Sequence, residues 1–184
     1  MKSINIGVLA FHGDIIEHIL ATEKAAIKLK LNVKIAPVRT KTELKNLDGL
    51  IIPGGESTTI QKLCQRENMI SEIQKIKYIF GTCAGAILLS NLKLLDISVE
   101  RNAYGRQNDS FEKEVKTSLG KLNAVFIRAP KIKNVGKDVN ILAKDGEEIL
   151  ACEQKINGNY YLATCFHPEL TSTIFHEYFL KQTN

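Results

Sequence analysis

Apolar residues follow two alternating spacings through the first half of the chain. Short apolar runs rich in β-branched residues predict buried strands at residues 3–10, 32–38, 50–53 and 77–81. Between them, the spacing and composition predict helices at residues 14–31, 42–46, 58–67 and 84–91. Strands that alternate with helices favour a parallel sheet with helices on both faces.

The pattern changes after Asn91, where strand-like segments follow one another without an intervening helix. We expect strands at residues 99–104, 114–119, 124–128, 139–144, 149–154 and 160–166, paired in antiparallel fashion. A last helix at residues 171–182 presents Phe175, Tyr178 and Phe179 on one apolar face. Together the two halves predict one α/β domain over residues 1–184, a three-layer sandwich with a mixed, mostly parallel central sheet and flanking helices.

Composition excludes several classes of protein. The chain has 184 residues, of which 44% are hydrophobic and 24% charged, and this balance is typical of a folded globular protein. The longest uncharged apolar stretch, residues 79–89, is far shorter than the ~18 residues of a membrane span. The first residues lack the apolar core and cleavage site of a signal peptide, so we expect a soluble, cytoplasmic protein.

Charge and cysteine spacing exclude further classes. The net charge is +5, but the lysines are scattered and no aromatic residue interleaves with the densest run, residues 131–137, so nucleic-acid binding is not expected. The four cysteines form no C-x-x-C pair, which gives a zinc site no support; they are Cys64, Cys83, Cys152 and Cys165. We expect free thiols, with neither a metal nor a cofactor.

One cysteine lies in a motif with chemical meaning. Residues 81–85, Gly-Thr-Cys-Ala-Gly, stand between a predicted strand and a predicted helix, which is the setting of a nucleophile elbow. Such a turn is strained and crowded, so side chains at Gly81 and Gly85 would clash. The helix N-terminus favours negative charge on Cys83 and makes the Ala84 amide a candidate oxyanion donor. The alternative is a glycine-rich turn around a packed cysteine.

A thiolate nucleophile needs a base, and His167 is the best-placed candidate. It ends the last predicted strand, and Glu169 follows two residues later. In an extended segment these side chains point the same way, about 6.6 Å apart at ~3.3 Å per residue, so the carboxylate can orient the imidazole. Cys83, His167 and Glu169 thus have the composition of a nucleophile–base–orienter triad. We expect His18 and His176 on solvated or partly packed helix faces.

A second glycine motif, Pro-Gly-Gly-Glu-Ser-Thr-Thr at residues 53–59, follows another predicted parallel strand. Ligands in such folds bind outside the carboxyl ends of the strands. Gly54 and Gly55 let the backbone approach a ligand, and the peptide between them can rotate at little steric cost. The structural alternative is a turn capped by Ser57. A phosphate loop fits poorly, because no G-x-x-x-x-G-K pattern is present.

In chain order, Gly-Gly-Glu-Ser, Gly-Thr-Cys-Ala-Gly and His-Pro-Glu resemble the class I, triad-type glutamine amidotransferases. Longer segments narrow the resemblance to the glutaminase subunits of pyridoxal 5′-phosphate synthase, a vitamin B6 enzyme. These segments are GVLAFHGD at 7–14, ERNAYGRQ at 100–107, SFE at 110–112, FIRAP at 126–130 and FHPEL at 166–170. The resemblance spans nearly the whole chain and implies the flavodoxin-like class I glutamine amidotransferase fold.

The resemblance implies a role for each candidate residue. Cys83 would attack the side-chain amide of L-glutamine, His167 would activate the thiol and protonate the ammonia, and Glu169 would orient His167. The amides of Gly55 and Ala84 would hold the oxyanion. The glutamine site would be lined by Gly55, Glu56, Ser57, Arg101, Ile127 and Arg128. The implied partner is a synthase subunit that receives the ammonia, and no nucleic acid, membrane or cofactor is implied.

The chain departs from the family pattern at His12, where the family usually has glutamine, and in the short segment between Gly85 and Arg101. Three alternatives stay open: a glutaminase subunit that serves another ammonia-dependent synthase, a cysteine esterase of the α/β-hydrolase type, and a non-catalytic binding subunit. In the esterase fold the acid precedes the histidine, whereas here Glu169 follows His167. The presence of all three triad residues disfavours a binding subunit.

Overall fold

The computed structural model describes residues 3–101, 103 and 110–184. Its strands are β1 Ile4–Leu9, β2 Val33–Val38, β3 Gly49–Ile52, β4 Tyr78–Thr82, β5 Ile97–Glu100, β6 Phe111–Thr117, β7 Gly120–Phe126, β8 Lys131–Val135, β9 Asn140–Asp145, β10 Glu148–Ile156 and β11 Asn159–Thr164. Its helices are α1 Ile15–Leu29, α2 Ser57–Arg66, α3 Ile70–Ile73, α4 Ala84–Asn91 and α5 Ile174–Thr183, with a 3-10 turn, η2, at Pro168–Leu170.

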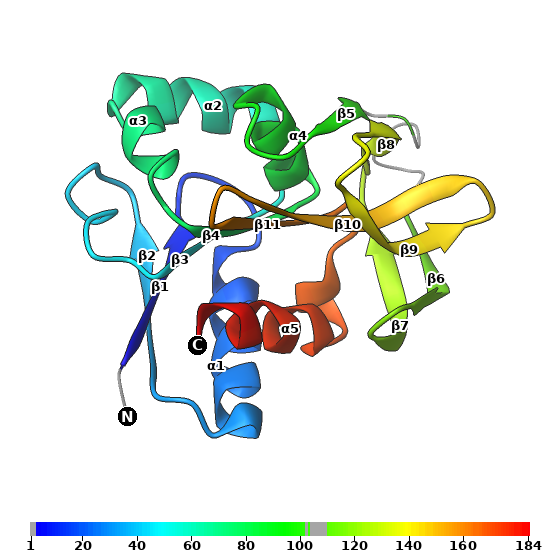
Figure 1. Cartoon of the computed structure of the whole chain (residues 1–184), viewed down its shortest axis with the longest axis horizontal. Helices are drawn as coiled ribbons and strands as arrows, with labels where there is room; N and C mark the ends of the chain where they lie inside the picture. The colour runs from blue at the N-terminus through cyan, green and yellow to red at the C-terminus, as the bar shows by residue number, and fades with distance from the viewer. Residues whose placement is uncertain (1–2, 102, 104–109) are drawn as a thin grey trace.

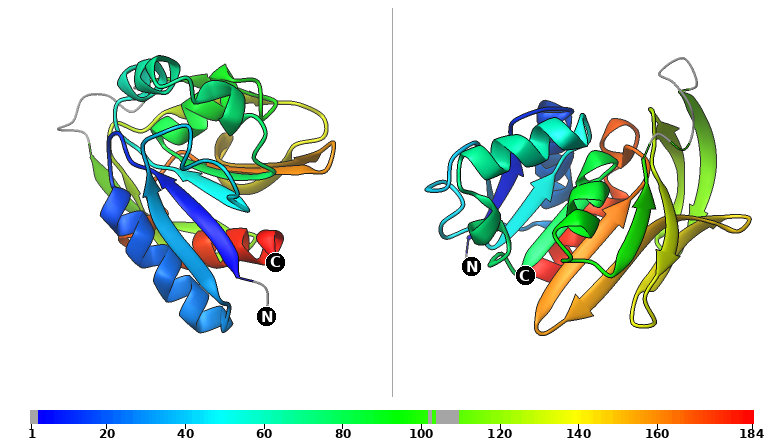
Figure 2. Two further views of the ribbon diagram at one scale, coloured as in Figure 1. Left: turned by 90° about the vertical axis from the view of Figure 1, so that its left-hand side faces the viewer. Right: turned by 90° about the horizontal axis from the view of Figure 1, so that it is seen from above.

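The elements form three layers, as predicted. Within the described residues, one sheet runs in the order β2-β1-β3-β4-β11-β10-β9-β6-β7, and β8 and β5 extend from β10 as a side branch. Helices α1 and α5 cover one face of the sheet, and α2, α3 and α4 cover the other (Figures 1 and 2). The predicted α/β sandwich with a mixed central sheet is therefore confirmed. The expectation of a mostly parallel sheet is wrong, because six strand pairs among the described residues are antiparallel and four are parallel.

The parallel half of the sheet brings four chain segments to one edge. Strands β2, β1, β3 and β4 run parallel, and β11 joins β4 in the same direction, with Thr164 opposite Thr82. Every residue of β3 is buried, as expected for a central parallel strand. The carboxyl ends of β1, β3, β4 and β11 consequently lie side by side, and the predicted motifs follow directly from them.

In the antiparallel half of the sheet, the strands pair as predicted, but their number and their bounds differ from the prediction. Pairs β6–β7, β9–β10, β10–β11 and β5–β8 are antiparallel. Strand β8 was not predicted, because its alternation of lysines with isoleucine and valine suggested only a basic run. Strand β5 is shorter than the predicted segment 99–104, and residues 102 and 104 of that segment lie outside the described residues.

The predicted helix at 42–46 is wrong, because residues 41–46 form turns. The Glu43 carboxylate accepts hydrogen bonds from the backbone N–H groups of Arg39 and Thr40, at 2.7 and 2.9 Å. Asn46 then adopts a φ of 66°, which no right-handed helix can continue through. The short helix α3 was not predicted either, since a single turn leaves little periodic signal.

Two apolar cores hold the layers together. On the face covered by α1 and α5, Phe80 of β4 packs with Phe175 and Phe179, both fully buried as predicted. The other core lies beneath α2 and α4 and includes Ile52, Ile60 and Leu88. None of the described helices is long and apolar enough to cross a membrane.

Candidate active site

The elbow around Cys83 has the geometry that the sequence predicts. Cys83 lies between β4 and α4 with φ 49° and ψ −104°, a backbone conformation that is strained for a side-chain-bearing residue. A Cβ atom on Gly81 would lie 2.6 Å from the carbonyl carbon of Gly85, and one on Gly85 would lie 2.1 Å from the carbonyl oxygen of Ile52. The Cys83 N–H donates to the Thr164 carbonyl at 2.8 Å, which ties the elbow to β11.

Cys83 differs from the other cysteines in its surroundings. Its thiol borders a pocket and lies 4.0 Å from the carbonyl oxygen of Ile127. The other three thiols are fully enclosed in the apolar core, as the sequence predicts for free cysteines. Burial raises the pKa of Cys64 and of Cys152 to about 12, and it raises the pKa of Cys165 further. Thiols of that kind are unreactive near neutral pH.

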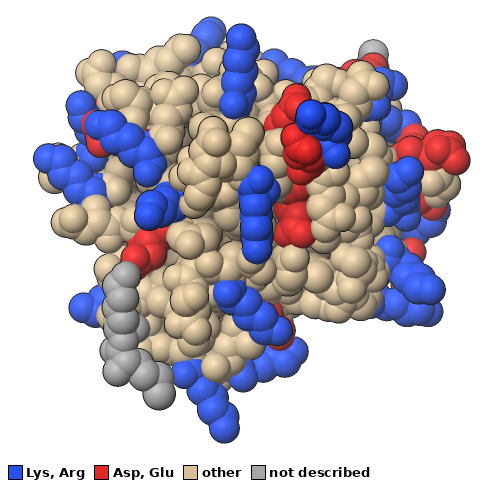
Figure 3. All heavy atoms as spheres, in the orientation of Figure 1, with Lys and Arg blue, Asp and Glu red and all other residues tan. Residues whose placement is uncertain are grey.

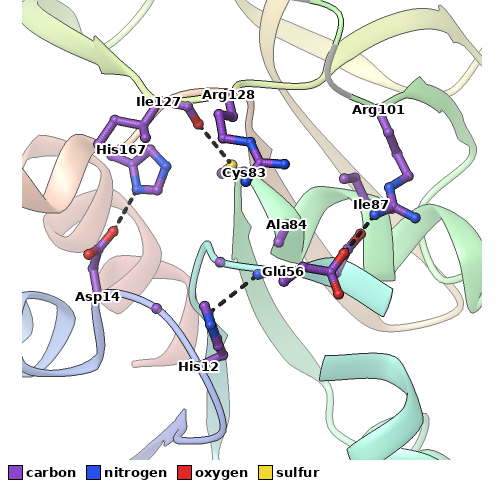
Figure 4. Close-up of a pocket in the computed structure, with 13 residues that line it drawn as sticks. His12, Asp14, Glu56, Cys83, Ala84, Ile87, Arg101, Ile127, Arg128 and His167 are labelled. Carbon is purple, nitrogen blue, oxygen red and sulfur yellow. Dashed lines mark hydrogen bonds and ion pairs between the residues drawn. The ribbon is translucent and has the colours of Figure 1, made fainter. Parts of the chain in front are cut away.

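His167 lies between the elbow and the Asp14 carboxylate (Figure 4), and a second carboxylate, that of Glu169, also contacts its ring. Its ring is 4% exposed, and its Nδ1 lies 2.8 Å from Glu169 Oε1 and 2.9 Å from Asp14 Oδ2. Its Nε2 has no hydrogen-bond partner among the described residues. Burial opposes protonation, but the Asp14 and Glu169 carboxylates at Nδ1 and the nearby Cys83 thiol outweigh it and raise the pKa of His167 to about 12.

The contact between His167 and Glu169 is confirmed, but the predicted extended backbone is wrong. Residues Pro168–Leu170 form η2, so Glu169 reaches the imidazole from a 3-10 turn and not from a strand. The φ angle of Pro168 suits the first position of a helical turn, which makes a turn the easier path. Burial raises the pKa of Glu169 despite its hydrogen bond with His167.

The expectation of solvated faces for His18 and His176 is wrong, because both are fully buried. His18 Nδ1 lies 2.9 Å from His176 Nε2, and His18 Nε2 lies 3.0 Å from Thr82 Oγ1 and 3.4 Å from Glu169 Oε1. Burial lowers the pKa of His18 well below its usual range and that of His176 to about 3, so both imidazoles are neutral at physiological pH. The two histidines therefore form a neutral polar layer behind the candidate triad.

The groups around the two neutral imidazoles indicate which ring nitrogen of each carries its proton. A proton on His18 Nε2 can be donated to Thr82 and toward Glu169, and His176 Nε2–H then donates to His18 Nδ1. The opposite tautomer would point a lone pair of His18 at the Glu169 carboxylate, which is repulsive. The first arrangement therefore gives the buried carboxylate a second donor.

The opposite end of the pocket is built around Glu56. Glu56, and not Ser57, is the N-cap of α2, because its carboxylate reaches the N–H groups of Thr58 and Thr59 at 3.3 and 2.7 Å. It also lies 2.7 Å from an Arg101 nitrogen. Hydrogen bonds from the hydroxyl and backbone of Thr59 and then from Thr58, with the Arg101 charge, lower its pKa to about 2.

One pocket of about 370 Å³ unites most of the predicted residues, which is a usual volume for a small-molecule site. The predicted residues that line it are Gly55, Glu56, Ser57, Cys83, Ala84, Arg101, Ile127, Arg128 and His167. Glu169 lies behind His167. Four lining residues were not predicted as site residues, namely His12, Gly13, Asp14 and Ile87. Part of the predicted segment 100–107, residues 102 and 104–107, lies outside the described residues.

Sequence reasoning missed Asp14, although a signal for it existed. Asp14 follows β1, whose carboxyl end lies at the same sheet edge as the predicted motifs. Asp14, His167 and Glu169 offer potential metal-ligand atoms within 4.8 Å of one another. Because both carboxylates already contact the imidazole Nδ1 at hydrogen-bond distance, the ring proton takes the position that a cation would need.

On the face shown in Figure 3, Lys and Arg side chains are spread out and acidic side chains lie among them. The lysines Lys24, Lys28 and Lys30 of the first helical segment are exposed. The excess positive charge thus forms no continuous stripe on this face.

Comparison with solved structures defines the class of this fold and site. One glutamine amidotransferase crystal structure superposes with a TM-score of 0.82 and 40% sequence identity, covering 97% of this chain and 98% of that one. A putative GMP synthase protein from Thermoplasma acidophilum, 20% identical with a TM-score of 0.69, shares the fold. The fold is therefore that of the class I glutamine amidotransferases.

The sequence comparisons identify the particular family. The model of the SNO glutamine amidotransferase family matches residues 8–184, and the chain belongs to that family. It is 46% identical to the "Pyridoxal 5'-phosphate synthase subunit PdxT" of Methanococcus maripaludis, over 96% of this chain and 95% of that protein. It is 43% identical to the protein of the same name from Oenococcus oeni, over 98% and 97%.

Proposed function

We propose that this chain is the glutaminase subunit of a pyridoxal 5′-phosphate synthase. It hydrolyses L-glutamine to L-glutamate and ammonia, and it passes the ammonia to a synthase subunit. The observation that carries this proposal is the strained Cys83 elbow in one pocket with His167, whose Nε2 is unpartnered among the described residues and whose Nδ1 contacts Glu169. The names of its relatives support the choice of synthase.

The reaction proceeds in two halves through a thioester. The Cys83 thiolate attacks the side-chain amide carbon of glutamine, and a C–S bond forms as the carbonyl π electrons move to oxygen. The protonated His167 then gives its Nε2 proton to the amide nitrogen, the C–N bond breaks and ammonia leaves. In the second half His167 takes a proton from water, the resulting hydroxide attacks the thioester, and glutamate and the thiolate are released.

The oxyanion of each tetrahedral intermediate is stabilised by the backbone amides of Gly55 and Ala84. The Ala84 amide opens α4, where the N–H groups have no partner within the helix. Gly55 has a φ of 116°, and a Cβ atom there would lie 2.4 Å from His12 Nδ1. The N–H of Glu56 lies 3.4 Å from the same His12 nitrogen, so His12 holds the peptide next to the donor.

The glutamine α-ammonium and α-carboxylate bind at the opposite end of the pocket. Arg101 provides a cation and Glu56 provides the acceptor at that end, beside Ser57. Arg128 provides a second cation nearer Cys83, next to Ile127, whose carbonyl oxygen lies 4.0 Å from the thiol (Figure 4). Glu56 and Arg101 are already paired, at 2.7 Å, so binding exchanges part of an exposed ion pair for contacts with the two ends of the amino acid. This exchange orients the side-chain amide toward Cys83.

The proposal includes a partner that controls the site. Rotation of the Gly54–Gly55 peptide would replace the N–H at the oxyanion with a carbonyl, and loss of one such donor typically costs ~10²–10³ in kcat. Docking of the synthase subunit selects the competent orientation.

Two further features of the proposal concern the chain as a whole. The free thiols suit a reducing, cytoplasmic location. The single sheet supports one glutaminase domain over residues 1–184.

The test is a glutaminase assay of the purified chain, alone and saturated with its synthase subunit. We expect glutamate production that rises at least about tenfold with the partner, and no hydrolysis of simple esters. Hydrolysis of esters without glutaminase activity would favour the esterase alternative. Absence of both activities, with the partner present, would favour a binding subunit. If the ammonia passes only to a different synthase, the proposed triad stands, but the proposed pyridoxal 5′-phosphate synthase partner is wrong.

A further inference from the structure

Asp14 occupies the N-cap position of α1 but does not cap it. Its carboxylate accepts no hydrogen bond from the first N–H groups of the helix. Aspartate at this position normally makes such a bond, which typically stabilises a helix by ~1 kcal/mol. Here the Asp14 carboxylate instead turns to His167, with Oδ2 2.9 Å from Nδ1 (Figure 4). The side chain is thus committed to the imidazole at the expense of the helix.

The backbone around Asp14 is built to hold this orientation. Gly13 has a φ of 93°, a conformation that side-chain-bearing residues rarely adopt. A Cβ atom on Gly13 would lie 2.1 Å from the carbonyl oxygen of Gly54, so the loop after β1 packs directly against the loop after β3. That contact fixes Asp14 at the pocket wall, where its side chain is 33% exposed.

Two carboxylates consequently compete for one ring nitrogen. Glu169 Oε1 lies 2.8 Å from His167 Nδ1, and Asp14 Oδ2 lies 2.9 Å from the same atom. A single N–H placed between them is shared, because both distances are those of charge-assisted hydrogen bonds. The two acceptors approach from different elements, Glu169 from η2 and Asp14 from the loop before α1.

We propose that Asp14 is a second positioning residue for His167, which together with Glu169 holds the imidazole and stabilises its protonated form. Asp14 acts through His167 and does not contact the substrate amide. This inference rests on the proposed glutaminase function for its kinetic consequences, whereas its effect on His167 holds for any activity of the pocket.

The two carboxylates differ in exposure and, as a result, in how readily they ionise. Glu169 is fully enclosed and burial raises its pKa, whereas the hydrogen bond from His167 lowers the pKa of the partly exposed Asp14. Asp14 is therefore the more readily ionised member of the pair. The other titratable groups near the ring and its two carboxylates are the Cys83 thiol, the neutral His18 behind Glu169, and His12, whose charge acts on Asp14.

The direct test follows the His167 ring by NMR titration in the wild-type chain and in Asp14→Asn. Asparagine is also a good N-cap residue, so α1 keeps its terminus. We expect the imidazolium of His167 to deprotonate at lower pH in Asp14→Asn, because a carboxylate that favours the proton has been removed. Asp138→Asn removes the same charge from an exposed position outside the pocket and should leave the titration unchanged. This readout does not require glutaminase activity.

Kinetics supply the second arm of the test. With the synthase subunit present, Asp14→Asn and Glu169→Gln should each lower kcat by about tenfold, because one carboxylate still holds the ring. The double variant should lose about 10³–10⁴, more than the product of the single losses. The alkaline limb of kcat/KM should move to lower pH in Asp14→Asn and be restored in Asp14→Glu, which a merely structural role would not do.

Two results would overturn the proposal. One is an unchanged His167 titration in Asp14→Asn. The other is a double variant whose loss equals the product of the single losses, with an unmoved alkaline limb. If the wild-type chain shows no glutaminase activity even with its partner, the proposed function fails, and the NMR titration still decides the role of Asp14.

Discussion

The two ends of the pocket are constructed differently. At the triad end, His167 and Glu169 are almost completely enclosed, and the buried pair of His18 and His176 supports them from behind. At the rim, the Glu56–Arg101 ion pair is open to solvent, with exposed side-chain fractions of 39% and 46%. The groups proposed to react are thus positioned by a buried polar network, whereas the groups proposed to bind glutamine are positioned by surface contacts.

This difference has an energetic basis. In the enclosed region each hydrogen bond is strong and an unpaired polar group is costly, so the geometry is narrowly determined. Exposed ion pairs contribute only ~0–1 kcal/mol, and they can exchange partners when a ligand arrives. Changes at the buried end should therefore lower the rate of chemistry, and changes at the rim should mainly weaken substrate binding.

The largest effect is expected at the nucleophile. Cys83→Ala should lose at least about 10⁴-fold in kcat while the chain stays folded, and Cys83→Ser should be nearly as inactive because an alkoxide is scarce at neutral pH. The measurement is glutamate production, with far-ultraviolet circular dichroism to confirm folding. Cys64→Ala is the matched control and should keep its activity. Covalent labelling of Cys64, Cys152 or Cys165 by a glutamine-like electrophile would contradict the assignment.

The next effect separates the base from its orienter. His167→Ala should lose about 10³-fold or more in kcat, since the proton carrier itself is removed. Glu169→Gln should lose less, because Asp14 Oδ2 still contacts the ring. Saturating kinetics with the synthase subunit provide the measurement. Wild-type kcat in His167→Ala would remove the triad from consideration.

A smaller effect is expected at the rim. Arg101→Ala should raise KM for glutamine by about tenfold with little change in kcat, because it removes binding that the ground state and transition state share. Lys133→Ala is the control, since Lys133 forms a comparable exposed ion pair with Glu100 on neighbouring strands. A loss in kcat alone would mean that Arg101 acts in the chemical step, and the two ends of the pocket would then not differ in function.

The smallest effect concerns stability and pH. The pKa of His176 is about 3 in the folded chain, whereas its ordinary value, expected in the unfolded chain, is 6.5. As the pH falls, the unfolded state therefore binds a proton at His176 before the folded state does. Stability should therefore fall below pH 6.5, by up to about 1.4 kcal/mol per pH unit for each buried histidine. His176→Gln keeps a donor near the Nε2 position and should lessen this slope between pH 6.5 and 5. Urea unfolding at each pH measures it, and an unchanged slope would show that His176 is not buried in its neutral form.

The sequence alone determined the alternation of strands and helices, the elbow and the candidate triad. Local rules are sufficient for these features, since apolar periodicity reports burial and the glycines of residues 81–85 report a crowded turn. The elbow therefore needed no tertiary information. The family resemblance, through several long motifs, indicated the remaining residues that we propose for the glutamine site.

Only the tertiary structure decided which polar residues far apart in the sequence meet. His18 and His176 are 158 residues apart, and no local pattern indicates that two helices bury them against each other. Asp14 reaches His167 because β1 and β11 end at the same edge of the sheet, and its failure to cap α1 is visible only in three dimensions. The sequence specifies each strand by its own residues, but the pairing order of the strands decides which carboxylates share one imidazole.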